Sequence, residues 1–233
     1  MFNIKTYYQS FISLFYPNLC LVCNRSVPFI DRRICLKCED QLPLTNFHLD
    51  EDNPIFEKFA GRINLEQAAA LFYFFKAGNV QTLIHDLKYH NKAEIGIQLG
   101  KMYGSILKED GYFKTVDFIL PVPLHPKKEK QRGYNQSDMF AQGLSTTLGK
   151  PWRKDILRRT EYTNSQTKKN IIDRFENVKY AFEIAKPDLI QNKHILIVDD
   201  VMTTGATMEV CAINCLEAAD CRVSFATIGF AVH

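Results

Sequence analysis

Apolar and polar positions follow two kinds of pattern along the chain, one typical of strands and one typical of helices. Stretches rich in apolar and β-branched residues, typical of strands, cover residues 71–75, 116–124, 152–160, 179–184, 194–200 and 222–232. Apolar residues three or four positions apart predict helices over residues 7–15, 79–89, 95–110, 135–149 and 207–219. Strands and helices should therefore alternate through most of the chain.

This order of elements predicts an α/β fold with a mostly parallel sheet flanked by helices on both faces. In such sheets, ligands bind at the carboxyl ends of the strands. The polar stretch 45–54 separates the first part of the chain from the rest. We expect an N-terminal helix and a cysteine-containing module at residues 1–45, followed by an α/β domain at residues 46–233.

Composition and charge fit a folded protein with one anion-facing region. The 233 residues are 46% hydrophobic and 24% charged, enough for one core and a small module. The net charge of +3 is small, but residues 127–179 hold 13 Lys/Arg against 6 Asp/Glu. Residues 1–20 are too short and too interrupted by polar residues to span a bilayer, and they lack a signal-peptide pattern. We expect a cytoplasmic protein without a membrane span.

The stretch ILIVDDVMTTGAT, residues 195–207, places Asp199 and Asp200 at the end of an apolar strand. The turn that follows leads into a helix N-terminus, where free N–H groups, Gly205 and threonine hydroxyls suit a phosphate. Two carboxylates suit vicinal sugar hydroxyls or a metal ion that carries a diphosphate. The pattern predicts a site for a phosphorylated pentose. The alternative is that Asp200 merely caps the helix, which leaves the second acid unexplained.

Seven cysteines divide into an N-terminal group of four and a C-terminal group of three. The first group forms two C-x2-C pairs: Cys20, Cys23, Cys35 and Cys38. Each pair suits a tight turn that presents two thiolates to one ion, so we expect a closed, structural Zn²⁺ site rather than four unrelated buried cysteines. The second group is expected to pack in the core, and its role is left open: Cys211, Cys215 and Cys221.

Basic residues occur near the cysteine pairs and again in the middle of the chain. Those near the pairs either contact nucleic acid or form a solvated face: Arg25, Arg32, Arg33 and Lys37. In the middle, PVPLHPKKEKQRGYNQS (residues 121–137) joins a predicted strand to a predicted helix through a turn in which Gly133 permits a tight bend. Its positive charges are Lys127, Lys128, Lys130 and Arg132. Arg132 is the best anion ligand among them, because guanidinium binds phosphate bidentately.

The motif at residues 195–207 resembles the phosphoribosyl-pyrophosphate motif of type I phosphoribosyltransferases. The cysteine pairs, LIHDLKYH, RGYNQ and LRRTEYTNSQ…DRFENV occur with it in an order that resembles the ComF family (ComFC and GntX-like proteins) over nearly the whole chain. The resemblance implies that Asp199 and Asp200 hold the ribose hydroxyls and that Arg132 joins them in the catalytic site. It also implies that Mg²⁺ accompanies the diphosphate, and that the polar segment 161–178 is a loop that closes over the reacting centre.

The same resemblance implies two further groups of substrate-binding residues. The loop that would hold the 5′-phosphate comprises Val201, Met202, Thr203, Thr204, Gly205, Ala206 and Thr207. Four more residues come from the LIHDLKYH and KEKQRGYNQ stretches: Lys88, Tyr89, Lys130 and Gly133. No general base stands out, because we interpret three histidines as polar surface or turn residues: His85, His90 and His125.

Two main functions follow as hypotheses. The ComF resemblance implies a protein that binds phosphoribosyl pyrophosphate and single-stranded DNA and supports DNA uptake in natural transformation, alongside other DNA-uptake proteins. Aromatic residues in or near the basic segment could stack on bases: Tyr89, Tyr134 and Tyr162. The alternative is a metabolic phosphoribosyltransferase that transfers ribose 5-phosphate to an amine or nucleobase; a third hypothesis is a sensor of the sugar diphosphate. The acceptor, the retention of catalysis and the oligomeric state are left open.

Overall fold

The computed structural model describes residues 18–27, 33–160 and 181–232. Its strands are β1 (Ala68–Phe74), β2 (Phe118–Pro121), β3 (Leu157–Arg159), β4 (Phe182–Ile184), β5 (His194–Met202) and β6 (Arg222–Ala231). Its helices are α2 (Leu36–Asp40), α3 (Pro54–Phe59), α4 (Asn79–Tyr89), α5 (Ala93–Glu109), α6 (Pro126–Arg132), α7 (Gln136–Leu148) and α9 (Ala206–Leu216). Two 3₁₀ turns complete the set: η1 (Phe47–Leu49) and η2 (Pro187–Leu189).

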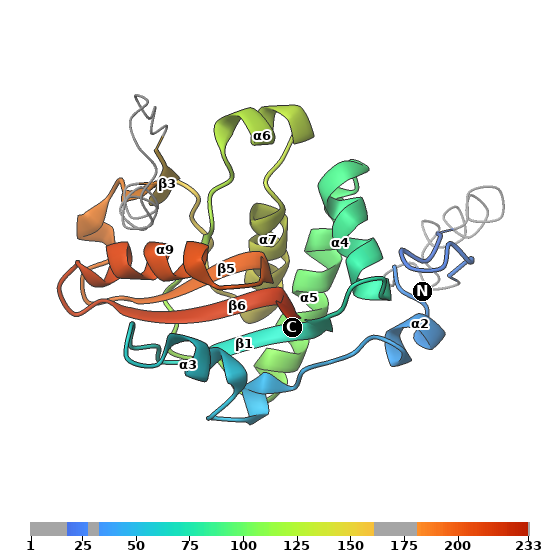
Figure 1. The fold of residues 1–233 in the computed structure, drawn as a ribbon, viewed down its shortest axis with the longest axis horizontal. Helices are drawn as coiled ribbons and strands as arrows, with labels where there is room; N and C mark the ends of the chain where they lie inside the picture. The colour runs from blue at the N-terminus through green and yellow to red at the C-terminus, as the bar shows by residue number, and fades with distance from the viewer. Residues whose placement is uncertain (1–17, 28–32, 161–180, 233) are drawn as a thin grey trace, which may run out of the picture.

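Four strands form one parallel sheet in the order β1-β6-β5-β2 (Figure 1). The short strands β3 and β4 form a separate antiparallel pair. Helices connect successive strands of the main sheet, as parallel pairing requires a crossover between neighbours. The predicted α/β fold with a parallel sheet flanked by helices is therefore confirmed.

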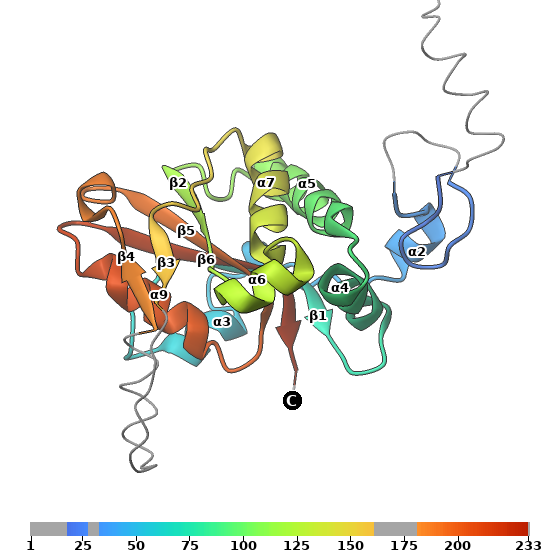
Figure 2. The ribbon, with the colours of Figure 1, turned by 90° about the horizontal axis from the view of Figure 1, so that it is seen from above.

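Both faces of the sheet are buried, which explains the unbroken apolar run of β5. Leu196 and Val198 point into a core cluster formed with α4, α5 and α7. Ile195 and Ile197 point the other way, into a cluster formed with α3 and α9. Figure 2 shows α5 and α7 on one side of the sheet and α3 and α9 on the other. Because alternate side chains of a strand face opposite sides, both sets must be apolar.

Most predicted elements form near their expected positions, and α4 has the predicted bounds. Two expectations need correction. The basic stretch 126–132, expected as a turn, is the helix α6, which Pro126 begins and Gly133 ends at φ +85°. The strand expected at residues 152–160 is regular only over Leu157–Arg159. The helix expected at residues 7–15 and the segment 161–178 lie outside the described residues.

The cysteine-rich segment lies beyond α4 and α5 in both views (Figures 1 and 2). Its buried side chains belong to the same apolar cluster as α4 and α5: Cys20, Leu21, Val27, Ile34, Cys38 and Leu42. After α2 the chain pairs with the outer edge of β1, where the Tyr73 N–H donates to the Pro43 carbonyl at 2.8 Å. These hydrogen bonds connect residues before and after the predicted domain boundary at residue 45. The division into two domains there stays a prediction. No helix in the described ranges is long and apolar enough to cross a membrane.

Candidate functional site

The carboxyl end of β5 carries the two predicted acids. Asp199 accepts hydrogen bonds from the Ser137 hydroxyl and the Asp200 N–H, each at 2.8 Å. Asp200 forms an ion pair with Lys88, with Nζ and Oδ2 2.8 Å apart. Burial, followed by the charge of Asp200, raises the pKa of Asp199 to about 7, and the Ser137 hydrogen bond opposes this rise. One acid of the pair is therefore close to its titration point at neutral pH.

The turn after these acids has the backbone geometry of an anion cradle. Thr203 and Thr204 are exposed, and α9 starts at Ala206, so its first N–H groups lack partners within the helix. Gly205 has φ +81°, and a Cβ there would lie 2.4 Å from Cζ of Phe59. The turn therefore requires glycine on two grounds, left-handed backbone and close approach.

The capping alternative is wrong for Asp200. The N-cap of α9 is Gly205, and no side chain caps it. Asp200 instead lies within β5, where its carboxylate contacts Lys88 from α4. The second acid is thus available for a role other than helix capping.

A basic cavity of about 510 Å³ lies between the end of α4 and α6. The described residues that line it are Lys88, Tyr89, Asn91, Lys128, Lys130, Gln131, Arg132 and Gly133. The structure thus brings together five of the predicted site residues from two separate motifs. The loop of residues 201–207 is not among the described lining residues, and Lys88, paired with Asp200, links the cavity to the acids.

The cationic side chain of Arg132 and the aromatic ring of Tyr89 lie together in the wall of this cavity. The guanidinium carbon of Arg132 lies 5.6 Å from the centroid of the Tyr89 ring, and Tyr89 is 66% exposed. One terminal nitrogen of Arg132 is buried and has no hydrogen-bond partner among the described residues. Because buried donors are nearly always satisfied, this nitrogen is suited to an anionic ligand.

Sequence reasoning missed Ser137, the residue that holds Asp199. Its position depends on Asn135, whose side chain caps α7 by accepting the Ser137 N–H at 3.2 Å. The Asn135 amide also donates to the Val122 carbonyl and to Asp138, each at 2.9 Å. An asparagine directly before a helical pattern was the available signal, since it predicts an N-cap.

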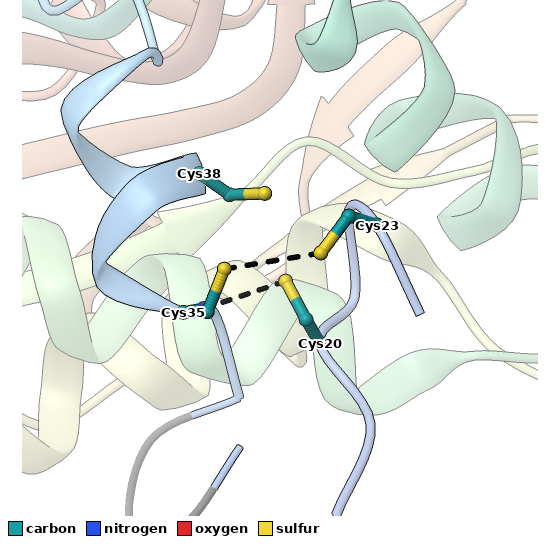
Figure 3. A group of neighbouring side chains, drawn as sticks. All are labelled: Cys20, Cys23, Cys35 and Cys38. Atoms are coloured by element: carbon teal, nitrogen blue, oxygen red, sulfur yellow. Dashed lines mark hydrogen bonds between the residues drawn. The ribbon is translucent and has the colours of Figure 1, made fainter. Parts of the chain in front are cut away.

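Figure 3 shows the four N-terminal cysteines converging on one point. Their sulfur atoms all lie within 4.8 Å of one another, and Sγ of Cys23 and Cys35 are 3.8 Å apart. A tetrahedral zinc with Zn–S bonds of about 2.3 Å needs sulfurs about 3.8 Å apart, so the cluster fits the ion. Burial raises the pKa of Cys20, but backbone N–H donors, one of them from Cys35 at 3.4 Å, lower it to about 6 overall. A thiolate is the form that binds metal.

The other three cysteines are buried, as expected for core residues: Cys211, Cys215 and Cys221. They pack in the cluster with α9 on the opposite face of the sheet from α4 and α5. Burial raises the pKa of the Cys221 thiol to about 11, so this cysteine is protonated at neutral pH.

Comparison with known proteins shows which family the chain belongs to. Residues 135–232 match the model of the phosphoribosyl transferase domain. The chain is 30% identical over 208 residues to DNA utilization protein YhgH of Escherichia coli strain K12, covering 84% of this chain and 83% of that protein. It is 27% identical over 204 residues to competence protein F of Haemophilus influenzae, covering 83% and 89%. The chain belongs to the ComF family.

Other relatives of this ComF-family chain are matched over shorter stretches or more remotely. Competence protein ComFC of Bacillus subtilis is 30% identical over 98 residues, which is 42% of this chain and 37% of that protein. The structure of adenine phosphoribosyltransferase from Saccharomyces cerevisiae aligns at 16% identity and a TM-score of 0.40, over 61% of this chain and 72% of that one. That likeness is too remote to support an inference about function.

Proposed function

We propose that the carboxyl end of β5 and the neighbouring cavity bind phosphoribosyl pyrophosphate. The observation that carries the proposal is the Lys88–Asp200 ion pair at 2.8 Å, which joins an acidic strand end to a basic cavity. A ligand with a hydroxylated sugar and several phosphates needs both kinds of surface side by side. The phosphoribosyl transferase domain match supports the same ligand.

Each part of the site then has a role. Asp199 and Asp200 accept hydrogen bonds from the ribose hydroxyls, and the turn at residues 201–207 binds the 5′-phosphate through N–H and hydroxyl donors. The guanidinium of Arg132, with Lys130 beside it, holds the diphosphate. Mg²⁺, bound with the diphosphate, would neutralise its charge and favour its departure as a leaving group.

The test is calorimetric binding of phosphoribosyl pyrophosphate with Mg²⁺ to the protein and to Asp199→Asn with Asp200→Asn. We expect the variant to lose detectable binding while keeping its circular dichroism spectrum. A matched control is Asp188→Asn with Asp220→Asn, which removes the same charge from exposed positions outside the site. Unchanged affinity in the first variant would remove the basis of the proposal.

The four-cysteine cluster is proposed to hold a structural Zn²⁺. All four ligands come from the protein, so no coordination position is open for a reaction. Among the described residues of the segment 18–44 the helix α2 is only five residues long, and a metal would supply cross-links that so short a module lacks.

We further propose that the chain binds single-stranded DNA and acts in DNA uptake. The names of two relatives, a competence protein and a DNA utilization protein, support this role. The exposed ring of Tyr89 beside Arg132, Lys128 and Lys130 provides a stacking surface within a basic cavity.

Binding to a single-stranded oligonucleotide should weaken steeply with salt, because bound cations are released from its phosphates. Lys128→Gln with Lys130→Gln should flatten the slope of log affinity against log salt by about 1.4, the value for two lost phosphate contacts. Lys108→Gln with Lys114→Gln, both exposed and outside the cavity, is the matched control. Fluorescence anisotropy at several salt concentrations measures these slopes, and no binding at low salt would favour the metabolic hypothesis.

A diphosphate-release assay separates binding from catalysis. Amines, nucleobases and single-stranded DNA are offered in turn with phosphoribosyl pyrophosphate. Release that depends on an amine or a nucleobase would identify a metabolic transferase. Binding without release under any of these conditions would identify a sensor or a DNA-handling protein.

A further inference from the structure

A second group of side chains of the types that ligate metals lies at the C-terminal end of α4, apart from the cysteines. Ligand atoms of His85, Asp86 and His90 all lie within 4.8 Å of one another. Nδ1 of His90 is 2.7 Å from Oδ1 of Asp86, and the two imidazole ring centroids are 5.2 Å apart. Two imidazoles and one carboxylate thus meet at one point on the surface.

The spacing is compatible with a metal after a small side-chain rotation. Zinc bonds to nitrogen and oxygen of about 2.0–2.1 Å place the donors of a tetrahedral site about 3.3 Å apart. The Asp86 and His90 donors are already within that separation, and His85 and His90 are exposed, so their rings can turn without disturbing the core. Three protein ligands leave at least one position for water or an anion.

Charge at the site selects the kind of ion. Nζ of Lys92 lies 2.6 Å from Oδ2 of Asp86. This ion pair involves the carboxylate form of Asp86, which is the form that ligates a metal. The positive charge of Lys92 opposes any cation, so the ion must have a strong affinity for imidazole. Mg²⁺ and Ca²⁺, which prefer oxygen ligands, are unsuitable.

We propose that His85, Asp86 and His90 form a second metal site for a divalent transition-metal ion such as Zn²⁺ or Ni²⁺. Oδ1 of Asp86, which lies beside Nδ1 of His90, is the oxygen available to the ion, because Oδ2 is paired with Lys92. Because Tyr89 and Asn91 line the basic cavity, the ion would sit at the rim of that cavity and add positive charge there. The proposal does not depend on the nature of the ligand in the cavity.

Stoichiometry provides the first test. The untagged full chain and His85→Gln with His90→Gln are equilibrated at a free Zn²⁺ concentration set by a metal buffer, and bound zinc is measured by mass spectrometry. The protein should bind one more equivalent than the variant, and His125→Gln should match the protein. Equal zinc content in the protein and the double variant would overturn the proposal. Both replaced histidines are exposed, and matching circular dichroism spectra verify the fold.

Lys92→Met provides a second test, which separates a metal site from a simple cap at the helix end. If the cluster serves only to pair charges, removing Lys92 has no effect on metal affinity. If it binds a metal, loss of the nearby positive charge should tighten Zn²⁺ binding at this site about threefold or more. Competition with a chelator measures the change, and affinity that stays equal or falls would contradict the proposal.

Discussion

At the residue scale, the most informative contact is the hydrogen bond from Ser137 to Asp199. An exposed aspartate is fully ionised at neutral pH. Burial and the charge of Asp200 raise the pKa of Asp199 to about 7. The Ser137 hydroxyl favours the ionised form, because it donates to a carboxylate oxygen at 2.8 Å. Ser137 therefore positions Asp199 and helps to keep it charged.

Ser137→Ala should shift the pH dependence of phosphoribosyl-pyrophosphate binding. The carboxylate is present above its pKa, so binding that requires it is lost as the pH falls through about 7. Without the hydroxyl the pKa of Asp199 rises further, and the midpoint should move up by about one pH unit. Ser137→Thr retains a hydroxyl and is the control. Calorimetry between pH 6 and 9 measures both midpoints, and coincident curves would show that Ser137 has no such role.

The sequence predicts which residues lie close together where they are consecutive, and it contains little information where they are far apart along the chain. Asp199 and Asp200 lie within one short motif, so their proximity follows from the chain itself. The bond between Ser137 and Asp199 joins residues 62 positions apart, and it exists only because α7 packs beside β5. Local patterns contain no information about that packing.

At the element scale, α5 and α7 approach closely because glycines face each other. A Cβ on Gly143 would lie 2.3 Å from the Ile97 carbonyl oxygen and 2.8 Å from Cα of Gly100. No rotation of a side chain relieves these contacts, since both partners are backbone atoms. The position of α7, and with it that of Ser137, thus depends on this interface.

Gly143→Ala should force the two helices apart and lower the free energy of unfolding by about 1–3 kcal/mol, the usual cost of overpacking a core. Gln142→Ala, at the exposed neighbouring position, should change it by less than about 0.5 kcal/mol. Urea denaturation followed by circular dichroism compares the two. Equal free energies of unfolding for the two variants would mean that α5 and α7 can move apart without loss of stability.

Helix α6 shows why some elements could not be predicted. The apolar pattern that identifies α4 or α7 exists because one face of each helix is buried. None of the seven residues of α6 is buried, so the sequence has no periodic signal there. The remaining signals were local: Pro126 at the first turn and Gly133 at the end, which together are typical of a short helix.

At the scale of the whole molecule, the cysteine cluster is connected to the sheet through a shared apolar core. Removing zinc with a chelator should first increase hydrogen exchange in residues 18–44, and then in the adjoining edge of β1. We expect this order because the proposed metal supplies stability that the short segment cannot supply by its own packing. Mass spectrometry of peptides from chelated and untreated protein measures the order, and unchanged exchange in residues 18–44 would argue against a structural metal.

The class of fold followed from the sequence, but the order of the strands did not. Alternating strand and helix patterns require crossovers and hence a parallel sheet. They do not specify that β6, the last strand, lies between β1 and β5. That order depends on which buried faces fit one another, and it appears only in the packed structure.

The pairing of Pro43 and Thr45 with β1 has a consequence for the integrity of the protein. β1 is the outermost strand of the sheet, and this segment occupies its outer side. A protease that removed the first 45 residues would leave the outward-facing groups of β1, among them the Leu71 C=O and the Tyr73 N–H, without these partners, while the other side stays paired with β6. Such an edge is a template for pairing with another chain, so the fragment would be prone to self-association. We therefore expect the N-terminal segment also to protect the protein against aggregation.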